Sequence, residues 1–244
     1  MAKSSGLGDN FYVGGFDLSG DTQSLKISGG HTPLDVTGIN KSAHERLGGI
    51  RTGQIDIVEF FNKAVGQEHP VLSALPTTDV DLMYMRGTAV GNPVAAMRSK
   101  QINYDPTRAN DGMLTIAVSG QSNGFGLEWG TQLTAGIRTD TAATNGSVFD
   151  NTVAGTNGCQ VYIQVFSRTV TDCTITIQSS AASNMSSPQT EATYLTTAAN
   201  TTTRIVGSNS SVNRYWRAIT TTSGGITSIS FAVAVMINPI ATVF

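Results

Sequence analysis

Alternation of apolar and polar residues constrains this 244-residue chain more than any other feature of its sequence. In the stretch "QIDIVEFF", Ile55 and Ile57 alternate with Asp56, and the same period of two recurs along much of the chain. Successive side chains of a β-strand point to opposite faces, so this period favours strands with one buried face. Spacing typical of helices is rare. The sequence therefore predicts an all-β fold with one or two short helices.

The first half of the chain is expected to hold both helices. Ser42–Leu47 begins beside the possible caps Asn40 or Ser42 and ends at two glycines, which favours one or two helical turns. His69–Leu75 is expected to form a second short turn that Pro76 ends. A turn at Gly29–Gly30 and a hairpin closed by Asp111–Gly112 are also expected. The strands predicted here are Thr32–Thr37, Gln54–Phe61, Asp79–Met85, Pro93–Tyr104 and Met113–Gly120, the last two forming that hairpin.

The second half differs in composition. Residues 136–156 are rich in Thr, Ala, Gly and Asn, which is typical of a linker. Residues 151–244 contain only six charged side chains but thirty Ser and Thr. This change predicts two β-rich domains, residues 1–135 and residues 157–244. Strands are expected in the second domain at 159–168, 172–179, 203–207, 214–222 and 227–237.

Charge and hydropathy exclude several classes of protein. Charged residues make up 13% of the chain, and 17 acids against 15 bases leave a net charge of −2. A protein that grips nucleic acid by its phosphates would carry a basic excess. No apolar run approaches the roughly 18 residues of a membrane-spanning helix. The start of the sequence has no apolar core typical of a secretory signal, so the chain is expected to accumulate in the cytoplasm that makes it.

The two cysteines fit the same compartment. Cys159 has the strand parity of Val161 and Ile163, and Cys173 has that of Ile175. Both are therefore expected to be small buried residues rather than partners in a disulfide.

Ser122 raises the question of an enzyme. The stretch "GQSNG" around it matches the G-x-S-x-G turn that exposes the nucleophile of α/β-hydrolases. That turn needs a helix after it, but three glycines follow closely, and a serine also needs a general base. His31, His44 and His69 all precede Ser122, whereas the hydrolase order places the histidine after it. Ser122 is therefore expected to be a turn residue.

Other catalytic or metal-binding patterns are absent from the sequence. It contains no spacing typical of zinc ligands and no glycine-rich loop that opens a helix. Asp79 with Asp81, and Arg98 with Lys100, are expected to be solvated faces of their strands. The sequence predicts no catalytic, metal or cofactor site, and hence no enzyme.

Three stretches together carry a resemblance to a known family. They are "LDVTGINKSAHERLGGIRTGQIDIVEFFN", "HPVLSALPTTDVDLMYMRGTAVGNPVAAMRSKQINYD" and "DGMLTIAVSGQSNGFGLEWG". Their order and spacing resemble the major tail protein, the tail tube subunit, of long-tailed phages with non-contractile tails. The likeness covers roughly residues 10–135, with residues 1–22 as an N-terminal arm or first strand. Residues 157–244 resemble the small immunoglobulin-like or jelly-roll sandwich that such proteins carry outside the tube.

This resemblance implies a tail-tube β-sandwich or barrel that stacks as rings, expected to be hexameric, into a tube for the genome. Its partners would be other copies of the chain, a tape-measure protein, a tail terminator and distal tail proteins. Genomic DNA would pass without sequence-specific binding, and no membrane is implied. The protein would reside in the virion tail after assembly in the cytoplasm of the host bacterium.

The same resemblance suggests roles for individual residues. Contacts between copies are expected at Phe11, Tyr12 and Phe16 and in the loop Arg46–Arg51. Acidic or neutral side chains would suit a lumen that must not hold DNA, and the candidates are Asp56, Glu59, Asp79 and Asp81. Deletion of residues 1–20 is expected to leave a folded chain that makes no tubes.

Two other interpretations remain open. One is a different phage structural protein, either a capsid decoration protein or a baseplate component. The other is a glycan-binding module in residues 157–244, where Tyr215 or Trp216 would be the stacking platform.

Overall fold

The computed structural model describes residues 5–239, and the fold is nearly all β with one short helix, as the sequence predicts. Contacts divide the chain into two compact units whose segments alternate along the sequence. Within the described residues, unit 1 comprises 5–20, 81–96 and 129–239, and unit 2 comprises 21–80 and 97–128. The predicted domains 1–135 and 157–244, with a linker at 136–156, stay a prediction.

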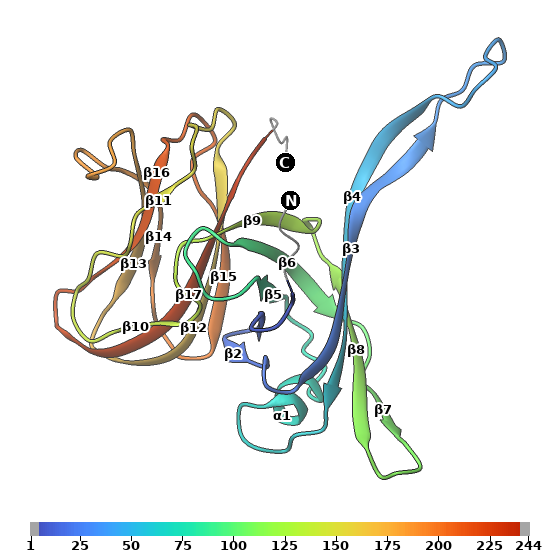
Figure 1. Cartoon of the computed structure of the whole chain (residues 1–244), viewed down its shortest axis with the longest axis horizontal. Helices are drawn as coiled ribbons and strands as arrows, with labels where there is room; N and C mark the ends of the chain where they lie inside the picture. The colour runs from blue at the N-terminus through green and yellow to red at the C-terminus, as the bar shows by residue number, and fades with distance from the viewer. Residues whose placement is uncertain (1–4, 240–244) are drawn as a thin grey trace. The chain divides into compact units, whose positions relative to one another are not determined.

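Each unit contains elements of its own, and three strands have residues in both units (Figure 1). Unit 2 contains β3 (Thr22–Asp35), β4 (Arg46–Phe60), α1 (Glu68–Leu72), β7 (Asp105–Arg108) and β8 (Leu114–Ser122). Unit 1 contains β1 (Asn10–Val13), β2 (Phe16–Asp17), β10 (Arg138–Asp140), β11 (Phe149–Asp150), β12 (Cys159–Val170), β13 (Thr174–Ser180), β14 (Gln189–Leu195), β15 (Thr201–Val206), β16 (Tyr215–Thr221) and β17 (Ile226–Ile237). The shared strands are β5 (Val80–Met85), β6 (Pro93–Gln101) and β9 (Glu128–Gln132).

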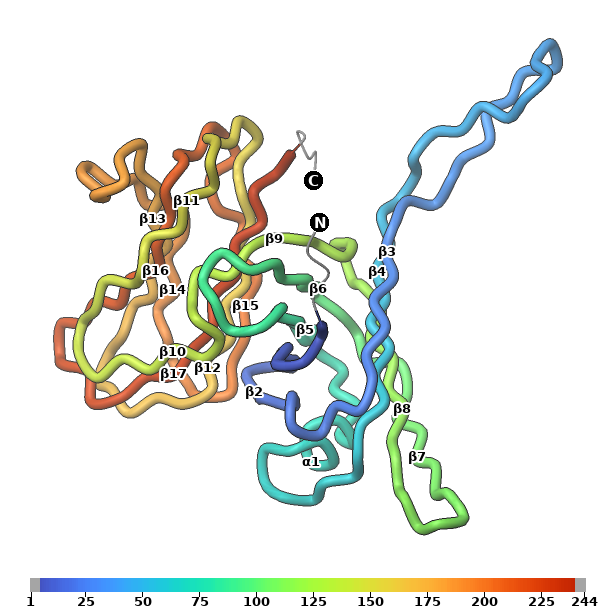
Figure 2. The backbone as a smooth tube through the Cα atoms, in the orientation of Figure 1, coloured from blue at the N-terminus to red at the C-terminus, as the bar shows by residue number. Residues whose placement is uncertain are grey.

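Unit 2 is built on the long antiparallel hairpin of β3 and β4. Their register runs from the pair Thr22 and Glu59 to the pair Asp35 and Arg46, with two irregularities. On its other side β4 pairs with β8, but only from Gln54 to Phe60. The far half of the hairpin is therefore two-stranded, and Figure 2 shows its strands running together to a tip.

Unit 1 contains strands of two sheets. One sheet has the strand order β15-β12-β17-β9-β6-β5-β1-β2, and a second has the order β11-β16-β13-β14. One face of β12 and β17 packs on the second sheet around the fully buried Trp216. The opposite face of the same two strands packs on Tyr12, Met83 and Met85. Because β12 and β17 are buried on both faces, their sequences are almost continuously apolar. The cysteines at 159 and 173 are buried and unpaired, as predicted.

The predicted helix at Ser42–Leu47 is wrong. Residues 36–45 connect β3 to β4 as a loop, and the chain is already extended at Arg46, which pairs with Asp35. A helix of six residues has too few internal hydrogen bonds to offset the free-energy cost of helix nucleation. In the hairpin, by contrast, the backbone at Arg46 pairs directly with the neighbouring strand. The predicted turn at His69–Leu75 corresponds to α1, which begins one residue earlier.

Two predicted turns also need correction. Gly29–Gly30 lies inside β3 instead of ending a turn. The turn at Asp111–Gly112 closes a hairpin between β7 and β8, whereas β6 pairs with β8 only at residues 99–101. The segment 136–156 includes β10 and β11, which pair with β17 and β16. The strands β7, β9, β10, β11 and β14 were not predicted from the sequence, whereas β1 and β2 lie in the stretch 1–22 that was expected to be an arm or first strand.

Candidate functional site: the polar face of the β3–β4–β8 sheet

One face of the unit 2 sheet consists of small or polar side chains that lie in rows across three strands. Neighbours in a row come from residues that pair directly, so their side chains lie side by side. None of these side chains is fully buried. The rows are Ser24–Val58–Ala117, Lys26–Asp56–Ser119 and Ser28–Gln54–Gln121.

Lys26 and Asp56 are neighbouring opposite charges on this polar face. Lys26 pairs across the strands with Asp56, and Gln54 Nε2 donates to Asp56 Oδ1 at 2.7 Å. Partial burial raises the pKa of Asp56, but hydrogen bonds from Gln54 and Ser119 and the charge of Lys26 outweigh it and lower the pKa overall. This carboxylate is therefore ionised at neutral pH, beside a lysine that cancels its charge.

A second balanced pair lies at the end of β6. Lys100 pairs with Gln121 and so extends the row Ser28–Gln54–Gln121. Lys100 Nζ lies 2.9 Å from Asp79 Oδ1, and Asn123 Nδ2 donates to the same oxygen at 2.8 Å. These two hydrogen bonds hold the pKa of Asp79 below its ordinary value. Lys26 and Lys100 are thus each placed beside an aspartate.

The other two predicted lumen residues do not lie on the polar face. Glu59 shares the parity of Ile55 and Ile57 and is fully buried in unit 2, where burial raises its pKa to about 8. Asp81 is buried in unit 1, where Thr202 Oγ1 donates to its carboxylate at 3.2 Å. The structure therefore brings Asp56 and Asp79 together with the polar face and leaves Glu59 and Asp81 in the interior of the chain.

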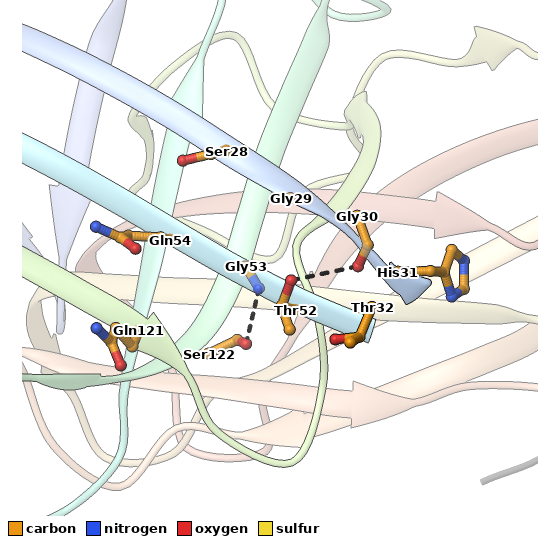
Figure 3. Close-up of a pocket in the computed structure, with 10 residues that line it drawn as sticks. All are labelled: Ser28, Gly29, Gly30, His31, Thr32, Thr52, Gly53, Gln54, Gln121 and Ser122. Carbon is orange, nitrogen blue, oxygen red and sulfur yellow. Dashed lines mark hydrogen bonds between the residues drawn. The ribbon is translucent and has the colours of Figure 1, made fainter. Parts of the chain in front are cut away.

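A cavity of about 540 Å³ opens where the polar face meets the far half of the hairpin (Figure 3). Ser122 lines it, and Ser122 Oγ accepts a hydrogen bond from the Gly53 amide at 2.9 Å. His31 also lines it, but Figure 3 shows its ring pointing away from Ser122, and His31 Nδ1 lies 3.1 Å from Gly49 O. The residues that follow Ser122 form bends and not a helix. The serine has neither the elbow geometry nor a base, so its hydroxyl serves as a structural acceptor.

The predicted contact residues fall into two groups. Phe11 and Tyr12 belong to β1 and are buried in unit 1, and the Tyr12 ring packs edge-on against Phe166 at 4.9 Å. Phe16 is half-buried. Arg46 is exposed near the hairpin tip, whereas Arg51 Nη2 donates to Leu127 O at 3.4 Å.

The strongest surface feature of unit 2 escaped the sequence analysis. Several large apolar residues near the hairpin tip are exposed to solvent. The relative exposure is 108% for Ile39 and 81% for Ile50. The signal in the sequence was an isoleucine or leucine every few residues within a polar, glycine-rich stretch. We call this set the tip patch, and it consists of Leu34, Val36, Ile39, Leu47 and Ile50.

A second apolar set lies at the opposite end of the hairpin. Phe60 is the last residue of β4, and the Phe61 amide donates to Leu114 O, beside Met113. These side chains are 39% exposed or more, and Val65 is almost completely exposed. We call this set the base patch, and it consists of Phe60, Phe61, Val65 and Met113.

The predicted glycan platforms differ in exposure. Trp216 is a fully buried part of the unit 1 core and cannot stack on a sugar. Tyr215 is half-buried, and the Arg214 guanidinium lies 5.0 Å from its ring centre. Among residues 5–239, no helix is long and apolar enough to cross a membrane, and no cluster of side chains could hold a metal ion.

Comparisons with known proteins give only distant likenesses. No family model matches the chain, and no curated protein matches it. A chain from the tail of an empty gene transfer agent particle is 17% identical, with 44% of this chain and 80% of that chain covered and a TM-score of 0.37. A chain from the virion of a native gene transfer agent particle is 14% identical, with 52% and 98% covered and a TM-score of 0.42. The SPP1 Dit protein, described as a paradigm of the hub adsorption apparatus in phages that infect Gram-positive bacteria, is 11% identical, with 93% and 99% covered and a TM-score of 0.33. Sequence identities and TM-scores as low as these do not indicate the function of this chain.

Proposed function

We propose that the chain is a structural virion protein, the major tail subunit of a long-tailed phage, which polymerises as stacked rings into a tail tube. The observation that carries the proposal is the β3–β4 hairpin, which combines a long free strand edge with apolar ends. It adds to the sequence resemblance over residues 10–135. No catalytic step is part of this function.

The edge of β3 supports lateral assembly. Among the described strands, β3 pairs with β4 alone, so the other edge of this 14-residue strand has no partner strand. Such an edge is a template for a strand from another chain. On the opposite side of the sheet, β7 also pairs with β8 alone within the described chain. A head-to-tail contact between these two different edges would close a ring, which we propose is a hexamer.

The two apolar patches support axial stacking. Five large side chains of the tip patch are exposed, and burying each is worth roughly 1.5–3 kcal/mol before the costs of association. The base patch lies at the other end of the same hairpin and is also apolar. Contact between the tip patch of one copy and the base patch of the next would therefore add subunits along one axis. Arg46 and Arg51 would flank that contact, and we keep Phe11, Tyr12 and Phe16 as further contact candidates.

The polar face suits the wall of a DNA channel. Duplex DNA carries about one negative charge per 1.7 Å, so a basic wall would hold it. The two lysines of the polar face lie beside aspartates, most of its side chains are small, and Asp56 and Asp79 are acidic members of it. We propose that these two residues line the lumen. Glu59 and Asp81 would line it only if assembly exposed them.

The remaining parts of the proposal follow from the resemblance. Residues 157–244 would form an outer domain joined through residues 136–156. A tape-measure protein, a tail terminator and distal tail proteins would be the partners during assembly in the host cytoplasm, and the virion tail would be the final location.

Electron microscopy of the purified full-length chain tests the proposal. We expect rings or hollow filaments of uniform width. Replacing Ile39 and Ile50 of the tip patch by Asp should raise the critical concentration for assembly on the order of 100-fold, because two exposed apolar contacts are lost. The fold should persist, because both side chains are exposed in the single chain.

Val153→Asp is the matched control, since Val153 is 65% exposed but lies in unit 1, outside both patches. It should assemble like the unmodified chain. A preparation that stays monomeric at every concentration would overturn the proposal. Normal filaments from the double variant would remove the tip patch from it.

A further inference from the structure

A second cavity, of about 440 Å³, lies in unit 1 and shares no lining residue with the polar face or with either patch. It falls within the range of roughly 300–1,000 Å³ typical of sites for small ligands. Its lining combines one large aromatic side chain with several hydrogen-bonding groups, which we call the aromatic wall and the polar wall.

The aromatic wall is Trp129, which belongs to β9 and is 56% exposed. Indole rings are large and apolar, so a tryptophan left this open in a cavity is available for stacking. Pro93 and Leu7 add apolar surface beside it. The other tryptophan of the chain, Trp216, is fully buried.

The polar wall is held in place by its own hydrogen bonds. The Asp9 carboxylate accepts from the Gly87 amide at 2.9 Å and lies 2.8 Å from Arg86 Nε. Tyr84 donates its hydroxyl to the same carboxylate. Asn92 Nδ2 donates to Arg86 O at 2.7 Å, which turns its amide oxygen away from that contact. These groups are fixed before any ligand arrives, which lowers the entropic cost of binding.

We propose that this cavity binds a neutral saccharide. A pyranose ring has an apolar C–H face that can stack on Trp129 and hydroxyl groups that can bond to Asn92 and to the partly exposed Arg86 guanidinium, which Asp9 holds in place. An anion would meet Asp9 and a cation would meet Arg86, since the two charges balance. A purely apolar ligand would cover these polar groups without replacing their hydrogen bonds to water, which is costly. A neutral ligand with one apolar and one polar side satisfies both walls.

Titration of the full-length chain with three disaccharides tests this proposal. The probes are maltose, cellobiose and N,N′-diacetylchitobiose, and the readout is tryptophan fluorescence with calorimetry as a second measurement. We expect a saturable change with at least one probe and a dissociation constant in the millimolar range. Emission from Trp216 should stay constant during the titration, because that ring is buried.

Trp129→Ala should abolish the calorimetric signal and leave the fold intact, since the side chain is largely exposed. Tyr215→Ala is the matched control, because it removes another accessible aromatic ring of unit 1 and should leave binding unchanged. Absence of a saturable signal with all three probes up to about 50 mM would overturn the proposal. Binding that survives Trp129→Ala would overturn it as well. The outcome is independent of the proposed tail function, since the assay reads binding whether or not the chain polymerises.

Discussion

The carboxyl group of Glu59 lies in the interior of unit 2, near those of Glu68 and Asp21. Thr22 Oγ1 donates to it at 3.1 Å, and its second oxygen has no hydrogen-bond partner among residues 5–239. Burial, followed by repulsion from Glu68 and Asp21, raises its pKa from 4.5 to about 8. Burial also raises the pKa of Glu68, and it raises that of the nearby Tyr104 to about 12. At neutral pH Glu59 is therefore largely protonated.

This shift predicts that unit 2 loses stability as pH rises. Between about 4.5 and 8 the unfolded chain releases the Glu59 proton but the folded chain keeps it, so the free energy of unfolding falls across this window. Glu59→Gln removes the titration and keeps the size of the side chain. We expect its thermal midpoint to exceed that of the unmodified chain at pH 8 and to decline less from pH 5 to pH 8, as measured by calorimetry.

Asp56→Asn is the control of opposite sign. The pKa of Asp56 is lowered in the folded chain, so its contribution is present above the unfolded pKa and is lost as pH falls. Its removal should cost stability at neutral pH. Equal pH profiles for Glu59→Gln and the unmodified chain would show that the buried carboxyl does not control stability.

At the scale of elements, the regular strands were predictable and the exceptions have physical causes. Alternation predicted the cores of β4, β8, β12 and β17, because each buries at least one face. Gly29–Gly30 was interpreted as a turn, but Gly29 lies in β3 because a close neighbour excludes larger side chains. A Cβ at Gly29 would lie 2.8 Å from Leu127 Cβ. That neighbour is remote in the sequence, so no local pattern could indicate it.

The same close approach is tighter at Gly53 and gives a prediction for β4. A Cβ added there would lie 2.5 Å from the Leu127 amide nitrogen and 2.8 Å from Met97 Sδ. Gly53→Ala should therefore destabilise the chain by about 1–3 kcal/mol through overpacking. Chemical denaturation measures this loss.

Gly30→Ala is the control, because a Cβ there meets nothing within 4 Å. Its effect should be small. If the two substitutions cost the same, the crossing of Leu127 over β4 would not be the reason for the glycine.

The candidate site was predictable only in part, because the burial of its residues depends on contacts that are remote in the sequence. Asp56 and Asp79 lie with the polar face and their place in a lumen stays a prediction, but the sequence could not tell that Glu59 turns inward on the same strand as Asp56. A glutamate on the apolar face breaks the alternation rule, because burial of a carboxyl is tolerated when it stays protonated.

The burial of Phe11 and Tyr12 also went unpredicted. It conflicts with the expectation that a chain without residues 1–20 stays folded, since β1 belongs to the core of unit 1.

At the scale of the whole molecule, the order of segments along the chain hides its organisation. Unit 1 gathers three separate segments, and contacts of that range leave no periodic trace in the sequence. The low charge of the chain is visible in the sequence, and it bears directly on assembly.

Assembly should depend little on ionic strength. The tip and base patches consist of apolar side chains, so their contact gains little from charge pairing that salt would screen. Raising sodium chloride from about 50 to 500 mM, which shortens the screening length severalfold, should change the critical concentration only slightly. Sulfate should promote assembly and cooling should weaken it, because both act on apolar burial.

Sedimentation velocity at matched protein concentrations measures both effects. Polymers that dissolve in sodium chloride but not in the cold would point to contacts between charged groups. The patches would then have no leading role in assembly.

The double burial of β12 and β17 has a consequence for how unit 1 comes apart. These two strands are a common wall between two cores, so neither core can loosen while the other keeps its packing. Heat or denaturant must therefore disrupt both together, as one cooperative step. A destabilising substitution in one of these two cores therefore also weakens the packing of the other core, with which the substituted residue has no contact.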